Sequence, residues 1–389
     1  MQFQTTRESL LAGITTVMRA VNQKSPVAAL SGILFEAGAG EAGQQGVSLT
    51  GSNMDLTIRR IIPAGVTVSG AVVLPARQLA EIVRRLPDVP VSITADHQKN
   101  SVELTYGRAR ALLNGYSAAE FPKPADPLTR VPGGRPADAG TPRLDITAPS
   151  KVFHNLFRRV IYAAGTDDLR PIFTGVLLEI DEGEIRAVAT DTHRLAMHRV
   201  DYEGEPENRK MQVIVSGRAL GELVRVLSQA EEEQFEVTIA ENYIVFSVGP
   251  TRIISRLIVG TYPDYRQVIP KVHQTRVSGI EAPLLLQTVE RAATLAQDGS
   301  PVINLHLGQG LLGVTAQSEA GSIHEEIPVE LAGQELEISF NAKYLEEALR
   351  WCESTQLILD FHGPVGPAII RPLGDGDTYL ALVLPVRPF

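Results

Sequence analysis

One amphipathic pattern occurs three times along the chain. Residues 74–86 (LPARQLAEIVRRL), 215–227 (VSGRALGELVRVL) and 340–352 (FNAKYLEEALRWC) align without gaps. Apolar residues coincide at i, i+4 and i+7, which is the spacing of one face of a helix. A segment that recurs in this way predicts three copies of one domain, each containing this helix. The coinciding apolar residues are Leu79, Leu220 and Leu345, then Val83, Val224 and Leu349, then Leu86, Leu227 and Cys352.

Two cationic positions recur in the same three helices and fall nearly opposite the apolar stripe, at about 100° per residue. An acid also recurs between them, as Glu81, Glu222 and Glu347. Ion pairs along a solvated face therefore explain the charges equally well in any one helix. Recurrence in three copies favours a shared functional surface. The repeated cations are Arg77, Arg218 and Lys343, then Arg84, Arg225 and Arg350.

Around these helices the pattern changes to short strands and one further helix per copy. The run MQFQTT precedes the first such helix, where Thr5 and Glu8 have the spacing of a capping box. The strand-like runs GILFEA (32–37), GVLLEI (175–180) and INLHL (303–307) are versions of one strand. Each copy is thus strand, helix, strands, helix, strands. This order predicts an α+β fold of three similar domains, with helices on one side and sheets on the other.

The boundaries between the copies follow from composition. Pro, Gly and Asp are concentrated in PKPADPLTRVPGGRPADAGTP, which has almost no periodic apolar residues and is typical of a linker. We expect a first domain at 1–125, a linker at 126–142, a second domain at 143–272 and a third at 273–389.

Composition narrows the class of protein. The 389 residues are 44% hydrophobic and 21% charged, as in an ordinary globular protein, and no apolar run is long enough for a transmembrane helix. The start of the chain shows no signal peptide. A single cysteine, Cys352, excludes an internal disulfide and fits a reducing cytoplasm. A net charge of −9 argues against a dedicated high-affinity nucleic-acid binder, but it allows cations gathered on one surface.

Motifs of catalysis and nucleotide binding are not found in the chain. It has no GxGxxG after a strand, no GxxxxGK[ST], no GxSxG and no HExxH. The densest polar cluster is ATDTHRLAMHR (189–199). Asp191 and His193 could form an acid–base pair there, and His193 and His198 could bind a metal. On a strand those two histidines face opposite sides, and no third ligand or nucleophile is nearby, so hydrogen-bonded structure is the simpler interpretation.

Two further segments are unusual. GTYPDYRQVIP (260–270) places two tyrosines, two prolines and an arginine together in a chain with 5% aromatic residues, which suggests a recognition surface or a rigid turn. The chain ends in LVLPVRPF, an apolar strand followed by Pro388 and Phe389. Such an end either frays or borders a groove.

At these segments the chain resembles the bacterial sliding clamps, the β subunits of DNA polymerase III. The matching motifs are FTGVLLE (173–179), ATDTHRL (189–195), YPDYRQVIP (262–270) and LPVR (384–387), and the resemblance covers the whole chain. It implies a head-to-tail homodimer ring of six similar domains, with helices lining the hole and sheets outside. Such a ring encircles duplex DNA and tethers the polymerase. It is placed by a separate ATP-driven loader and has no catalytic residue or cofactor.

The resemblance also implies a pocket for partner proteins. In this family a mostly apolar groove with a few polar groups binds the Leu- or Phe-bearing tails of polymerases and the loader, a form of short-peptide recognition. Its residues in this chain are Phe173, Thr190, Thr192, His193, Arg194, Leu195, Pro263, Gln267, Val268, Asn341, Tyr344, Val365, Leu384, Pro385, Val386 and Arg387.

DNA and subunit contacts are implied in the same way. Phosphate-only contacts through flexible cations carry no sequence information and permit sliding. The subunit interface would place Ala111 and Leu113 of an edge strand against Thr294 and Leu295 of a helix. The implied DNA contacts are Lys24, Arg77, Arg84, Arg218, Arg225, Lys343 and Arg350.

The chain departs from the family pattern at the pocket, with Thr192 where glycine is usual and Gln267 where arginine is frequent. Two other functions stay open beside the clamp. A hydrolase or transferase built on Asp191 and His193 predicts an activity that is lost in His193→Ala. A protein-interaction scaffold without a DNA role predicts that charge reversal on the repeated helices has no effect.

Overall fold

The computed structural model describes residues 1–38, 46–96, 98–122, 143–181, 183–202, 210–230, 234–240, 242–296, 301–374 and 378–386. The expected linker at 126–142 lies outside these ranges. Contacts divide the chain into two compact units. The first is Met1–Lys151 with Glu222–Leu257, and the second is Val152–Gly221 with Ile258–Phe389.

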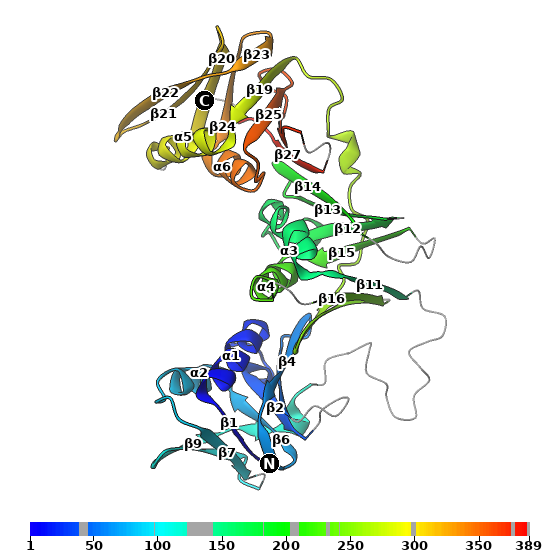
Figure 1. Ribbon diagram of the computed structural model, residues 1–389, viewed down its shortest axis with the longest axis vertical. Helices are drawn as coiled ribbons and strands as arrows, with labels where there is room; N and C mark the ends of the chain where they lie inside the picture. The colour runs from blue at the N-terminus through cyan, green and yellow to red at the C-terminus, as the bar shows by residue number, and fades with distance from the viewer. Residues whose placement is uncertain are drawn as a thin grey trace. The chain divides into compact units, whose positions relative to one another are not determined.

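The first unit contains two antiparallel sheets (Figure 1). The five-stranded sheet has the order β5 (Gly65–Val68), β1 (Gln2–Thr5), β7 (Val91–Asp96), β8 (Ser101–Tyr106) and β9 (Ala109–Asn114). The nine-stranded sheet has the order β10 (Tyr116–Ser117), β6 (Gly70–Pro75), β2 (Gly32–Ala37), β3 (Gly46–Ser52), β4 (Leu56–Pro63), β18 (Thr251–Arg256), β17 (Tyr243–Val248), β16 (Gln234–Ala240) and β11 (Arg143–Pro149).

Helices α1 (Arg7–Val17) and α2 (Ala76–Arg84) lie side by side in the first unit, and α1 packs on β3 and β4 (Figure 1). Their apolar faces are buried, as the spacing predicts: Ile14, Leu79 and Val83 have no exposed surface.

The predicted capping box at the start of α1 is wrong. Thr6, not Thr5, is the N-cap, and its hydroxyl accepts the backbone N–H of Ser9 at 3.1 Å. Thr5 belongs to β1, where its hydroxyl donates to the carbonyl of Pro63 at 2.7 Å. The strand extends to Thr5 because this residue pairs with β7, so the helix begins one residue later.

The second unit repeats this plan of a long and a short antiparallel sheet. The four-stranded sheet has the order β22 (Gly321–Pro328), β21 (Leu311–Ser318), β20 (Val302–Gly308) and β24 (Leu336–Asn341). The nine-stranded sheet has the order β15 (Met211–Ser216), β12 (Gly175–Asp181), β13 (Glu184–Thr190), β14 (Arg194–Asp201), β27 (Tyr379–Val383), β26 (Ala368–Pro372), β25 (Gln356–Phe361), β19 (Thr275–Glu281) and β23 (Glu330–Gly333).

Helices α5 (Ala282–Leu295) and α6 (Ala342–Arg350) lie side by side in the second unit (Figure 1). Leu345, Leu349 and Cys352 are buried in its main core, which confirms the apolar face predicted for α6. Among the described residues, none of the helices is both long and apolar enough to cross a membrane. The other helical segments in the described ranges are α3 (Ser150–Arg158), α4 (Gly217–Leu227) and the short helices η1 (Met18–Ala20), η2 (Ala28–Ser31), η4 (Ala118–Glu120), η5 (Ile161–Ala163), η6 (Pro171–Thr174) and η7 (Tyr265–Gln267).

Each nine-stranded sheet joins strands that are far apart in the sequence. In the first unit β4 pairs with β18, so that Ile58 lies opposite Ile253. In the second unit β14 pairs with β27, so that Leu195 lies opposite Leu382. Backbone pairing therefore connects different copies of the repeat, and the second of these junctions builds the site described next.

Candidate functional site

An apolar cavity of about 260 Å³ opens beside the junction of β14 and β27. Leu195 and Leu382 lie opposite each other on these strands, and Leu384 follows two residues after Leu382. Side chains from η6 and from the segment around η7 complete the walls. The lining residues are Phe173, Thr190, Thr192, Arg194, Leu195, Pro263, Asp264, Tyr265, Val268, Leu382 and Leu384.

The turn between β13 and β14 is fixed by its own side chains. Asp191 Oδ1 accepts the backbone N–H groups of His193 at 2.9 Å and Arg194 at 3.0 Å. Thr190 Oγ1 donates to the carbonyl of Arg194 at 2.6 Å. Thr192 sits at the tip with φ +79°, a conformation that a β-branched residue rarely adopts and glycine adopts freely. The departure from the family pattern therefore places strain at the edge of the cavity.

Arg194 is a buried cation in the cavity wall, with 8% of its side chain exposed. Its Nε donates to Asp191 Oδ2 at 2.9 Å, and its Nη1 donates to Glu347 on α6. The guanidinium also lies 4.5 Å from the ring centre of Tyr344 and 5.4 Å from that of Tyr162. Two acids and two aromatic faces hold the planar cation in one orientation, so the wall has a defined shape.

The segment around η7 forms the opposite wall. Asp264 Oδ1 accepts the backbone N–H of Arg266 at 3.2 Å and begins η7, while Pro263 and Val268 line the cavity. Tyr265 is 3% exposed, and burial, helped by the neighbouring Glu179, raises the pKa of its hydroxyl to about 12. The segment is thus a rigid turn with a buried tyrosine, and the same turn presents apolar side chains to the cavity.

A second, more polar cavity of about 460 Å³ adjoins the first and shares Phe173, Thr192 and Arg194 with it. His193 and Tyr344, both predicted pocket residues, line this second cavity, and their rings stack with centroids 6.2 Å apart. The other lining residues are Ala164, Gly165, Thr166, Asp167, Arg170, Asp191 and Lys343.

Several predicted pocket residues line neither cavity as the structure describes them. Gln267 donates to Asp264 Oδ2 at 3.1 Å, and Asn341 caps α6 by accepting the backbone N–H of Tyr344 at 3.2 Å. Val365 is 76% exposed. Pro385 and Val386 follow the cavity-lining Leu384, and Arg387 lies outside the described residues.

Sequence reasoning missed three residues of the apolar cavity, namely Asp264, Tyr265 and Leu382. Two of them belong to the aromatic segment that was already singled out. Leu382 could have been found from Leu384, because residues two apart on a strand share a face.

The cations of the repeated helices are all exposed. Ion pairing is confirmed in two copies at i, i+3: Arg84 lies 3.1 Å from Glu81, and Arg225 lies 2.6 Å from Glu222. The third copy differs because Glu347 is bound to Arg194. Its Arg350 instead pairs with Glu346 at 2.5 Å and Glu290 at 2.8 Å. Glu222 is buried and also lies 3.4 Å from Arg19, so a solvated face is wrong for this acid. The guanidinium groups of Arg84, Arg225 and Arg350 are themselves exposed, which leaves these cations able to meet another anion. Lys24 is also exposed, in the loop after η1.

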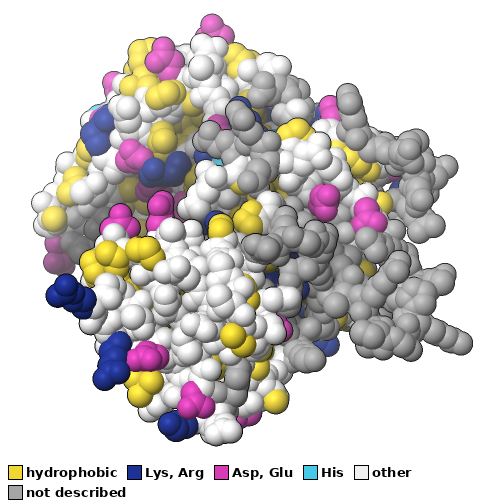
Figure 2. Space-filling view, turned by 60° about the horizontal axis from the view of Figure 1, so that its bottom comes forward, with side chains coloured by type: hydrophobic (Ala, Val, Ile, Leu, Met, Phe, Trp, Pro, Cys, Tyr) yellow, Lys and Arg dark blue, Asp and Glu magenta, His cyan; other side chains and the backbone are white. Residues whose placement is uncertain are grey.

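Charges of both signs are interspersed on the face of the molecule shown in Figure 2, where Lys and Arg side chains stand near Asp and Glu side chains. Ala111 and Leu113 lie on β9, the edge strand of its sheet, with the missed Leu112 between them at 69% exposure. Thr294 and Leu295 end α5. The edge strand β9 is a position where another strand could be added, since edge strands carry unpaired backbone groups.

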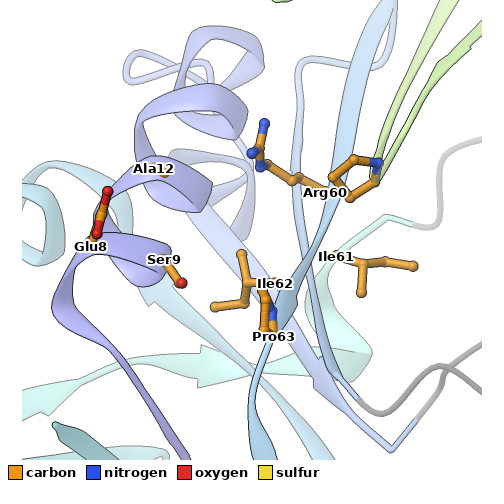
Figure 3. Close-up of a pocket in the computed structure, with 8 residues that line it drawn as sticks. Glu8, Ser9, Ala12, Arg60, Ile61, Ile62 and Pro63 are labelled. Carbon is orange, nitrogen blue, oxygen red and sulfur yellow. The ribbon is translucent and has the colours of Figure 1, made fainter. Parts of the chain in front are cut away.

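The first unit has a larger cavity, about 540 Å³, between α1 and β4 (Figure 3). Glu8, Ser9 and Ala12 line it from the helix, and Arg60 and Ile62 line it from the strand. None of the pocket, DNA-contact or subunit-interface residues predicted from the sequence lines it, which sets it apart from the site in the second unit.

The geometry does not assemble the alternative catalytic pair. The hydrogen bonds described for the Asp191 carboxylate go to backbone N–H groups and to Arg194, while the ring of His193 stacks on Tyr344. Within the described ranges, the acidic, histidine and cysteine side chains form no group of three that could hold a metal.

Comparison with known proteins decides the family. The family descriptions for the N-terminal, central and C-terminal domains of the DNA polymerase III β subunit match residues 1–125, 147–264 and 266–387. The chain belongs to this family and is a sliding clamp. This confirms the fold class predicted from the repeat, a three-domain clamp fold of mixed helix and strand.

Individual relatives agree over their full length. The chain is 30% identical to the beta sliding clamp of Staphylococcus aureus and 32% identical to that of Halalkalibacterium halodurans, with all of each chain covered. Its structure is similar to the sliding clamp of Bacillus subtilis, with a TM-score of 0.88 and 30% identity over both whole chains. It is also similar to a Pseudomonas aeruginosa clamp bound to griselimycin, with a TM-score of 0.86 and 28% identity over both whole chains. A clamp is a processivity factor, a class that is not generally enzymatic, so neither the scaffold nor the hydrolase interpretation is favoured.

Proposed function

We propose that two copies of this chain close head to tail into a ring around duplex DNA and tether the replicative polymerase through the apolar cavity. The observation that carries the tether is the cavity itself. Three segments that the sequence singled out separately meet there and leave a preformed apolar space with a few polar groups, as short-peptide recognition requires.

The cavity suits a Leu- or Phe-bearing peptide from the polymerase, the clamp loader or another partner. Leucines at its base and Phe173 offer apolar surface, whereas Arg194 and Thr190 are already committed to hydrogen bonds within the protein. Binding energy would come mainly from burying apolar side chains of the peptide.

DNA contacts would be made by the repeated cations. The exposure of all six, at the same positions of three equivalent helices, supports a role in meeting phosphate without reading sequence. A closed ring needs no tight grip, so weakly paired cations are adequate and would permit sliding.

Other parts of the proposal follow the family. Ala111 and Leu113 would pair the edge strand β9 of one copy with the α5 region, including Thr294 and Leu295, of the other. The domain boundaries at 125, 142 and 272 would separate the three clamp domains and the linker. The clamp would act in the cytoplasm, without a cofactor and without catalysis of its own.

Retention on DNA tests the ring. The protein is loaded on nicked circular DNA by a clamp loader, isolated at high salt, and the DNA is then cut once. Retention on the circle and loss on cutting are expected for a topological link. Salt-sensitive binding that ignores cutting would indicate a groove binder instead, and no association at all would favour a scaffold.

A further inference from the structure

Glu179 lies on β12, outside the apolar cavity, and is 8% exposed. Its carboxylate accepts four hydrogen bonds. Oε2 accepts from the Tyr265 hydroxyl at 2.7 Å, from Arg266 Nη2 at 2.6 Å and from Arg186 Nη1 at 3.3 Å. Oε1 accepts from Gln212 Nε2 at 2.9 Å. A buried carboxylate with this many donors is held strongly in place.

Two of the four donors, Tyr265 and Arg266, come from the segment around η7 that forms one wall of the cavity. Tyr265 lines the cavity and packs in a small core with Leu195 and Leu382, while its hydroxyl reaches Glu179. Arg266 places its guanidinium 4.6 Å from the ring centre of Tyr265 and bonds to the same carboxylate oxygen. The segment around η7 is therefore bonded to β12 through two side chains, those of Tyr265 and Arg266.

The rest of the segment is held mainly by local bonds. The backbone N–H of Gln267 donates to Asp264 and that of Val268 donates to Tyr265, each at 3.2 Å. These bonds shape η7 but do not attach it to β12. Val268 itself is 56% exposed. The position of the wall relative to the leucines at the cavity base thus depends strongly on Glu179.

We propose that Glu179 is a positioning residue for partner binding, which holds the Tyr265–Val268 wall at the spacing that a peptide side chain requires. This inference rests on the proposed peptide-binding function of the cavity. Glu179 does not line the cavity, so its effect passes through Tyr265 and Arg266.

A matched control exists one strand away. Glu184 begins β13, and its carboxylate accepts from Arg186 and from Arg199, the latter at 2.9 Å. It belongs to the same ionic cluster as Glu179 and shares Arg186 with it, but the structure records no bond from it to the segment around η7. Its link to that segment is indirect, through Arg186, whose Nη1 also donates to the Tyr265 hydroxyl at 3.4 Å. Glu184→Gln therefore disturbs the cluster but leaves every bond between Glu179 and the segment in place.

The test uses the full chain and a fluorescein-labelled ten-residue peptide that ends in Leu-Phe, with Kd measured by fluorescence anisotropy. Glu179→Gln keeps the side-chain shape but replaces an acceptor with a donor that faces other donors. Its affinity is expected to fall about tenfold, as for the loss of hydrogen bonds to a charged group, while Glu184→Gln stays within about twofold of the unchanged chain. Equal affinities for the two variants would overturn the proposal.

Two further measurements separate positioning from general loss of structure. Tyr265→Phe removes only the hydroxyl and is expected to weaken binding about threefold. Because the bond between Tyr265 and Glu179 is among those that Glu179→Gln already breaks, the losses in the double variant should be less than additive, and fully additive losses would contradict the mechanism. Amide hydrogen exchange at Val268 should be faster in Glu179→Gln but not in Glu184→Gln. If the unchanged chain fails to bind the peptide, the proposed tether itself is wrong, and this inference falls with it.

Discussion

Arg194 beside the apolar cavity and Arg225 on α4 both bond to a glutamate, yet 8% of the first side chain is exposed and 58% of the second. Arg194 has a second acid and two aromatic rings around it. Arg225 has an i, i+3 pair with Glu222, which is 11% exposed and also lies 3.4 Å from Arg19, so Glu222 keeps a cation when Arg225 turns to solvent. A pair between two exposed partners typically contributes roughly 0–1 kcal/mol. Breaking a buried pair by removing one partner typically costs about 3–5 kcal/mol. Arginine therefore has two uses in this chain. Arg194 fixes the shape of the cavity wall, whereas Arg225 stays able to exchange one anionic partner for another.

The difference matches the two proposed tasks. A cavity that recognises a peptide gains affinity when its walls are already ordered before binding. Cations that must pass from phosphate to phosphate gain nothing from a fixed geometry, because sliding requires contacts that break easily. Four experiments, taken from the largest expected effect to the smallest, test how far this contrast extends.

Arg194→Ala tests the buried side most directly. It leaves Asp191 and Glu347 without their common cation, so the free energy of unfolding should fall by about 3 kcal/mol in chemical denaturation. Arg350→Ala, which breaks pairs with Glu346 on α6 and Glu290 on α5, should cost less than about 1 kcal/mol. Similar losses in both variants would remove the distinction between the two kinds of arginine.

Acid should weaken the second unit through His198, which is 6% exposed on β14. Burial, and next the nearby charge of Arg159, lower the pKa of this imidazole from 6.5 to about 4. Because the unfolded chain binds the proton more readily, this stability is complete above pH 6.5 and is lost as pH falls toward 4. The free energy of unfolding should drop by about 2 kcal/mol from pH 8 to pH 5 on account of this group.

Replacing His198 by glutamine provides the comparison for that titration. The variant should show a flatter dependence of stability on pH between 7 and 5, whatever its stability at pH 8. An unchanged slope would mean that other groups dominate the acid response.

Charge reversal tests the exposed side. Arg77, Arg84, Arg218 and Arg225 are changed together to glutamate. All four are exposed, so the folded state should persist, with some loss of stability where Arg225→Glu faces the buried Glu222. Retention on circular DNA and processive synthesis should fall by about tenfold through repulsion from phosphate. Circular dichroism and thermal melting check the fold. Normal processive synthesis by the quadruple variant would refute a role for these cations in holding DNA.

Thr192→Gly should give the smallest effect and the opposite sign. Thr192 has φ +79°, which glycine adopts without strain, so the substitution should raise the free energy of unfolding by about 1 kcal/mol. Thr166→Gly, at an exposed position of the neighbouring polar cavity, is the control and should not stabilise the chain. A destabilised Thr192→Gly variant would show that contacts of the threonine side chain outweigh the backbone strain.

The sequence predicted the helices and their buried faces well because their signal is local. Leu79 and Val83 repeat at a helical spacing, and both are fully buried. It was less reliable at the helix start, where Thr5 and Thr6 are both suitable caps by type. Pairing of Thr5 with β7, a contact far away along the chain, determined which of them ends the strand.

The cavity was predicted in part, and its limits have a physical cause. Motifs located Thr190, Leu195 and Val268, but Leu382 was missed, and His193 faces a different space. Whether a residue near a motif lines a cavity depends on where neighbouring strands place their side chains. A motif in a single sequence carries no information about where the side chains of those neighbouring strands lie.

What the sequence determined by itself was the threefold repeat, the class of fold, the family and the segments that carry the site. These follow from periodicity and from motifs that act within one helix or one turn. Only the tertiary structure decided which partner each charged side chain has and how far it is buried. Glu347 occupies the same repeat position as Glu81 and Glu222. Those two acids pair with an arginine of their own helix, whereas Glu347 binds Arg194, because the turn after β13 lies against α6. The sequence gives the charge of each residue, but the ion-pair partner of that residue and its burial depend on which surfaces the fold brings together.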